Sequence, residues 1–174
     1  MGESVPNPHR QQQLYWAQLY ELKAACVYIR RYRGYLSKWV TTTGTIRAIA
    51  SSASIAAWVI WKEHAFIWAA IIAVSQVLDA VKDVFPMTKR HKAASDHVHQ
   101  LESLFIDAQL EWENIFSGHY TDDEIMHRRH QLMKLQHDAE VKNFPDGLPE
   151  RPSDFSGAES ETEAYFKRLS DMQK

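Results

Sequence analysis

The sequence predicts an all-α protein in which a two-helix transmembrane hairpin is flanked by long amphipathic cytoplasmic helices. Its 174 residues include only six Gly and six Pro, so few positions oppose long helices. Apolar residues at heptad spacing occupy both flanks, and two uncharged apolar runs lie between them. The length is about that of one domain, and a single cysteine, Cys26, excludes a disulfide within the chain.

Four segments are expected along the chain. They are an N-terminal amphipathic helix (8–40), the transmembrane hairpin (41–85, with helices 41–61 and 65–85), cytoplasmic helices (88–142), and a Pro-containing linker with a short C-terminal helix (143–174). The first forty residues are polar and aromatic, with no cationic start before an apolar core. The sequence therefore predicts no signal peptide.

The first helix carries a regular apolar face. Steps of four and three residues join Tyr15, Leu19, Leu22, Cys26 and Ile29, which is a heptad pattern. An aromatic stripe follows, made of Tyr28, Tyr32, Tyr35 and Trp39, and it is interleaved with Arg30, Arg31 and Arg33. Rings and arginines in this order can stack on nucleobases and hold phosphates. They also suit an interfacial segment that leads into a membrane span, and both interpretations stay open.

Two apolar runs form the predicted hairpin. They are Ala48–Trp61 and Ala65–Leu78, separated only by Lys62-Glu63-His64. Each run is short for a membrane span, but both extend outward through tolerable residues. Helices over 41–61 and 65–85 would each be about 31 Å long, close to the thickness of the hydrocarbon layer.

The distribution of charge favours a membrane over a soluble core. Basic residues lie before the pair (Arg30, Arg31, Arg33, Lys38, Arg47) and after it (Lys82, Lys89, Arg90, Lys92), whereas the turn has only Lys62. By the positive-inside rule, both termini are cytoplasmic and the turn faces outward. Tryptophans flank the spans as an aromatic belt does, at Trp39, Trp58, Trp61 and Trp68. A buried soluble hairpin explains the apolar runs but not this sorting of charge.

Polar residues form a face on each predicted span. The candidate pore-lining residues are Arg47, Ser51 and Ser54 on the first span, and Ser75, Gln76, Asp79 and Asp83 on the second. Arg47 and Asp79 are equally distant from Glu63, so they would lie at the same depth. They either pair with each other or extend to the cytoplasmic interface. One two-helix subunit cannot cover such faces, so the sequence predicts a homo-oligomer with a polar centre.

The C-terminal flank shows two further helices and a possible third. An apolar face joins Val98, Leu101, Phe105, Ala108, Trp112 and Ile115. Gly118 ends this helix, and Thr121-Asp122-Asp123-Glu124 is a capping box for the next, whose apolar positions are Ile125, Leu132, Leu135 and Ala139. A linker follows, and Ser156-Gly157-Ala158-Glu159 resembles a second capping box before Tyr165, Phe166 and Leu169.

No catalytic motif is found. The sequence has no Gly-rich phosphate loop, nucleophile elbow or cysteine pair. His97 and His99 diverge on a helix, and no carboxylate or thiol ligand accompanies His127 and His130, so the histidines are interpreted as solvated surface residues. We expect a non-enzyme without catalytic residues, metal or cofactor.

The organisation of the chain resembles a known family. An aromatic, arginine-bearing helix leads into TTTGTIRAIASSASIAAWVIW and AFIWAAIIAVSQVLDAVKDVF, and LEWENIFSGHYTDDEI and NFPDGLPER follow in the tail. Over roughly residues 12–150 this is similar to the SLATT family of two-transmembrane effectors from prokaryotic conflict and anti-phage defence systems. The last thirty residues fall outside the resemblance.

The resemblance implies a function. It implies an oligomeric pore or ion channel in the bacterial inner membrane, either opened by a signal or held shut by a bound ligand that infection removes. A homo-tetramer is our own working number. A nucleotide or oligonucleotide made by a partner nucleotidyltransferase would gate it, and opening would disrupt the membrane and kill the host cell, as in abortive infection. Arg30, Arg31 and Arg33 are then the candidate contacts for the anionic regulator. The alternative is a membrane-anchored or soluble all-α interaction scaffold without channel activity.

Overall fold

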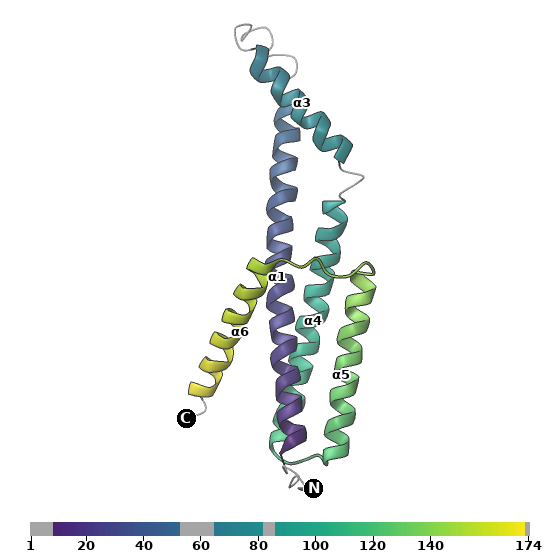
Figure 1. The fold of residues 1–174 in the computed structure, drawn as a ribbon, viewed down its shortest axis with the longest axis vertical. Helices are drawn as coiled ribbons and strands as arrows, with labels where there is room; N and C mark the ends of the chain where they lie inside the picture. The colour runs from purple at the N-terminus through teal and green to yellow at the C-terminus, as the bar shows by residue number, and fades with distance from the viewer. Residues whose placement is uncertain (1–8, 53–64, 82–85, 173–174) are drawn as a thin grey trace, which may run out of the picture. The chain divides into compact units, whose positions relative to one another are not determined.

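The computed structural model describes residues 9–52, 65–81 and 86–172, and every regular element in these ranges is an α-helix. The helices are α1 (Arg10–Ser52), α3 (Ala65–Val81), α4 (Met87–Phe116), α5 (Asp122–Asn143) and α6 (Pro152–Met172), as Figure 1 shows. The predicted all-α class is confirmed. The chain divides into two compact units. The four-helix unit comprises residues 1–32 and 93–174, and the apolar unit comprises residues 33–92.

The core of the four-helix unit lies between α1 and α4. The predicted heptad face from Tyr15 to Ile29 is buried, and so are Val98, Leu101, Phe105, Ala108 and Ile115 on α4. The two helices are antiparallel: Gln12 donates a hydrogen bond to the Ile115 carbonyl, and the Tyr15 hydroxyl donates to the Ala108 carbonyl at 3.3 Å. Each large apolar side chain buried here stabilises the fold by about 1.5–3 kcal/mol. Both heptad predictions are confirmed, except that Trp112 is only half-buried.

Helix α5 begins where the sequence predicts. The Thr121 side chain accepts a hydrogen bond from the Glu124 backbone N–H, and Glu124 accepts one from the Thr121 backbone, so the capping box is confirmed. The preceding chain reverses at Gly118, whose positive φ of 75° favours glycine. Ile125, Leu132 and Ala139 are buried, but the prediction is wrong for Leu135, which is 51% exposed.

Helix α6 begins at Pro152, one turn before the predicted cap at Ser156. The prediction was wrong because proline, which lacks an N–H, is well suited to the first helical position. Asp154, also in the first turn, complements the helix dipole. Helix α6 packs on α1 through Phe166, whose ring lies 5.0 Å from Trp16 and 5.4 Å from Tyr20 between centroids.

The apolar unit contains the end of α1, helix α3 and the start of α4. No helix end separates the predicted N-terminal helix from the first predicted span, because α1 continues from Arg10 to Ser52. Helix α3 covers Ala65–Val81 of the second predicted span. Residues 53–61 and 82–85 of the two spans, and the turn at 62–64, lie outside the described residues. Within the ranges that are described, no helix is both long enough and apolar enough to cross a membrane.

Candidate functional site

The predicted pore-lining residues lie in the apolar unit. Arg47 on α1 and Ser75 on α3 are half-buried, and Gln76 is exposed. The backbone is helical at Ser51 and Asp79, whereas Ser54 and Asp83 lie outside the described residues. The common depth of Arg47 and Asp79, and the lining of a pore by either face, therefore stay predictions.

The three arginines proposed to bind a regulator differ in their surroundings. Arg30 forms an ion pair with Glu102 of α4, at 2.5 Å between Nη2 and Oε1. Arg31 forms one with Glu161 of α6, at 2.5 Å between Nη1 and Oε1. Arg33, one position into the apolar unit, is half-buried. An anionic ligand on Arg30 or Arg31 therefore competes with a carboxylate of the same unit.

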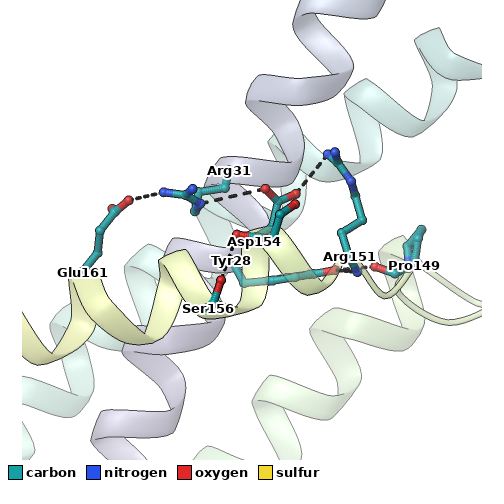
Figure 2. A network of polar contacts seen from close by, with 8 residues as sticks. Tyr28, Arg31, Pro149, Arg151, Asp154, Ser156 and Glu161 are labelled. Carbon is teal, nitrogen blue, oxygen red and sulfur yellow. Dashed lines mark hydrogen bonds and ion pairs between the residues drawn. The ribbon is translucent and has the colours of Figure 1, made fainter.

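Arg31 belongs to a polar network that joins α1 to the start of α6 (Figure 2). The buried carboxylate of Asp154 lies between two guanidinium groups, 3.9 Å from Arg31 Nε and 3.0 Å from Arg151 Nη1. The Tyr28 hydroxyl donates a hydrogen bond to the Pro149 carbonyl and accepts one from the Arg151 backbone N–H at 3.2 Å. The network holds the linker before α6 against α1.

Next to this linker the four-helix unit forms a partly open cavity of about 340 Å³. All four helices and the linker contribute to its lining. The walls are mainly apolar and aromatic, and they include Tyr20, Ala24, Ala25, Tyr28 and Ile29 of α1, Leu101 of α4, Leu148 of the linker, and Phe155 and Ala158 of α6. Because the lining comes from separate segments, the cavity exists only when α6 is packed against α1.

Three acidic residues line the cavity, one from each of three helices. They are Glu21 on α1, Glu140 on α5 and Glu159 on α6, and no lysine or arginine is among the described residues that line this space. The polar floor is His97 of α4, which is 2% exposed. Burial lowers the pKa of His97 below its usual value, so the imidazole is neutral at pH 7. The cavity therefore combines an apolar wall with a negative rim.

The histidines are distributed differently from the prediction. His99, His127 and His130 are exposed as expected, but His97 is buried, so the interpretation of all histidines as solvated is wrong. The His97 ring packs edge-to-face against Phe144, with 5.6 Å between ring centroids. The Asn143 side chain contacts its Nδ1 atom. Among the residues that the structure describes, no group of His, Cys, Asp and Glu side chains is placed to hold a metal ion.

The lone cysteine has a structural position. Cys26 is buried on the α1 face that packs into the core. Burial raises the pKa of its thiol to about 12, which keeps it protonated and unreactive at neutral pH. The predicted place of Cys26 on the apolar heptad face is confirmed.

The cavity was not predicted from the sequence. Glu21, Glu140 and Glu159 each lie among many other exposed acidic residues, and no spacing links residues of α1, α5 and α6. The sequence offered one signal, the position of His97. It directly precedes Val98 on the apolar face of α4, where a solvated histidine is not expected.

Comparison of the chain with protein-family models, curated proteins and solved structures finds no match.

Proposed function

We propose that this chain is a subunit of a homo-oligomeric membrane pore or ion channel. The apolar unit would insert into the bacterial inner membrane, and the four-helix unit would regulate it from the cytoplasm as the effector of an anti-phage defence system. The observation that carries this proposal is the exposed apolar surface of α3. The charge pattern and the family resemblance of the sequence agree with it.

Helix α3 exposes large apolar side chains along its length. Phe66 is 86% exposed and Val77 is 61% exposed, and Ile72 and Val74 between them are also exposed. Such a surface is unfavourable in water and marks contact with a membrane or with other protein. Lipid tails and neighbouring subunits would cover it in the proposed pore.

Three hydroxyl groups of the apolar unit are compatible with a surrounding of lipid. Thr43 donates a hydrogen bond to the Trp39 carbonyl at 2.9 Å, Thr45 to the Thr41 carbonyl at 2.9 Å, and Ser75 to the Ile72 carbonyl at 2.9 Å. Each hydroxyl is therefore satisfied within its own helix, which is the requirement where no water is available.

The polar residues of the same unit need a different surrounding. Arg47 on α1 and the exposed Gln76 on α3 would be costly against lipid, so they are proposed to face other subunits or a water-filled centre. A homo-oligomer provides such a centre.

The proposed signal is a nucleotide or oligonucleotide made by a partner nucleotidyltransferase. Its phosphates would replace Glu102 on Arg30 and Glu161 on Arg31. Because the second of these ion pairs links α1 to α6, such binding would loosen α6. Binding of the regulator would thus be coupled to a movement of α6 within the four-helix unit.

The proposal is tested by fractionation and ion flux of the full chain. The expressed protein should stay with membranes through an alkaline wash and be extracted only by detergent. Reconstituted into vesicles, it should release ions, and the Asp79→Leu variant should change the conductance. A protein found in the soluble fraction would contradict the membrane proposal, and unchanged conductance of Asp79→Leu would exclude its face from the pore.

A second candidate function is an interaction scaffold without channel activity. Ile106 and Leu110 lie one turn apart on α4 and are 66% and 62% exposed, which favours contact with a partner protein. Retention in the membrane together with an absence of ion flux would favour the scaffold over the pore.

A further inference from the structure

We infer that the cavity between α1, α4, α5 and α6 is a binding site for a small organic cation with an apolar body. The inference uses the geometry of the four-helix unit alone. It is therefore independent of whether the apolar unit forms a membrane pore.

The size of the cavity suits a small molecule. Its volume of about 340 Å³ falls within the range of roughly 300–1,000 Å³ that is typical of ligand sites. The space exists because three wall positions are alanines, Ala24 and Ala25 on α1 and Ala158 on α6. A larger apolar residue at Ala158 would occupy the volume that a ligand needs.

Aromatic rings supply part of the wall. Tyr20, Tyr28 and Phe155 line the cavity, and a cation close to the face of such rings is attracted by their quadrupoles. The rings are held in place before any ligand arrives. Tyr20 stacks on Phe166, and Tyr28 packs edge-on against Phe155 while its hydroxyl binds the linker.

The acidic residues around the cavity favour a positively charged ligand. Several carboxylates of this unit have basic partners: Glu102 pairs with Arg30, Glu111 with Arg128, and Glu161 with Arg31.

In contrast, Glu21, Glu140 and Glu159 form no ion pair with any residue in the described part of the chain, yet they surround one apolar space. His97 is neutral, and no basic side chain among the described residues lines this cavity. Arg151, which lines an adjoining pocket with Glu140 and Glu159, is paired with Asp154. A cation is attracted and a phosphate is repelled.

A ligand in this cavity would contact both α6 and the linker that precedes it. Phe155, Ala158 and Glu159 belong to α6, and Leu148 belongs to the linker that precedes it. Binding should therefore hold α6 against α1, in the direction opposite to a phosphate ligand that displaces Glu161 from Arg31.

The test is calorimetric titration of the full chain in a non-ionic detergent with benzyltrimethylammonium. Benzylphosphonate, which has the same aromatic body and an opposite charge, is the control ligand. The decisive variant is Glu21→Gln/Glu159→Gln, since both side chains are exposed and their exchange removes charge without removing packing. The matched control is Glu113→Gln/Glu163→Gln, which removes the same charge from exposed positions outside the cavity.

We expect the cation to bind and the phosphonate not to bind. Affinity for the cation should fall by about tenfold or more in Glu21→Gln/Glu159→Gln and stay within about twofold in the control variant. A folded protein that binds no cation at millimolar concentration would overturn the inference. Equal binding of the two ligands, or equal affinity in the two double variants, would also overturn it. None of these readouts uses membrane insertion or ion flux, so failure here is distinct from failure of the pore.

A second variant tests the location. Ala158→Leu should abolish binding by filling the space, while the circular-dichroism spectrum stays helical. If a folded Ala158→Leu variant bound the cation as well as the parent protein, the cavity would not be the site.

Discussion

Arg31 of α1 reaches Glu161 of α6, with 2.5 Å between Nη1 and Oε1, and on its way it passes directly over Gly157. A Cβ atom at position 157 would overlap the guanidinium group. The absence of a side chain at Gly157 thus leaves room for the guanidinium group in this position. The same glycine makes α6 intrinsically less stable as a helix, by about 0.5–1 kcal/mol relative to alanine.

Replacing Gly157 with alanine should therefore have different effects in two backgrounds. In the parent protein, Gly157→Ala displaces the Arg31 side chain, and amide hydrogen exchange in α6 should accelerate. In an Arg31→Ala background the clash is gone, and the same change should stabilise the protein by about 0.5–1 kcal/mol. Urea denaturation and hydrogen exchange measure the two effects, with Ser160→Ala on the same helix as control. Equal effects in both backgrounds would contradict the proposed clash.

The buried His97 should make stability depend on pH. In the unfolded chain its imidazole binds a proton near the usual pKa of 6.5, whereas burial lowers the pKa in the folded state. Below pH 6.5 the unfolded state binds more protons, so stability should fall as the pH falls from 7 towards 5, by at most about 1.4 kcal/mol per pH unit. His97→Gln should flatten this slope, and the exposed His99→Gln should not. Identical slopes in all three proteins would refute the assignment.

The capping box of α5 should contribute measurably to the free energy of unfolding. Thr121→Ala removes the side chain that accepts the Glu124 N–H, and we expect a loss of about 1 kcal/mol in the free energy of unfolding. The exposed Ser117→Ala, just before the loop, is the control. The Glu124 pKa is lowered mainly by the hydrogen bond from the Thr121 backbone.

The contribution of the Glu124 carboxylate is therefore present above its ordinary pKa of 4.5 and is lost as the pH falls through the lower folded value. A Glu124→Gln variant should differ from the parent at pH 7, and this difference should shrink below pH 4.5. A difference that stays constant with pH would show that the charge of Glu124 is not involved.

If α3 contacts lipid, the effect of a lysine substitution should depend on its position along the helix. Val74→Lys places a charge on the exposed apolar surface near the middle of 65–85, which costs about 3 kcal/mol in a bilayer. The fraction of protein that resists an alkaline wash should drop. Gln76→Lys, two positions away among polar residues, should have a smaller effect. If both variants fractionated as the parent does, lipid would not be what covers Val74.

Local patterns of the sequence predicted the parts of the fold that depend on neighbours along the chain. The heptad face from Tyr15 to Ile29 and the capping box at Thr121 follow from the helical period and from the chemistry of a helix start. Two predictions of this kind were wrong, the start of α6 and the burial of Leu135. Pro152 begins α6 before Ser156 does, and Leu135 lies on a helix that buries only one narrow face.

The features that depend on tertiary packing could not be predicted in this way. The burial of His97 depends on Phe144, which arrives from the end of α5. The cavity needs Glu21, Glu140 and Glu159 to meet from three helices, and the pairing of Arg31 needs Glu161, which is 130 positions away. No periodicity within one helix encodes such meetings.

The linker that Tyr28 anchors affects how well a free partner molecule can compete with α6 for the surface of α1. Residues 144–151 tether α6 to α5, so a detached α6 stays at an effective concentration of about millimolar next to α1. The contacts made by Arg31 and Tyr28 can therefore be individually weak and still keep α6 in place. A free partner molecule that binds the same surface of α1 must be either as concentrated as the tethered helix or correspondingly tighter in affinity. Lengthening the linker with glycine and serine residues would lower the effective concentration of α6 and with it this threshold.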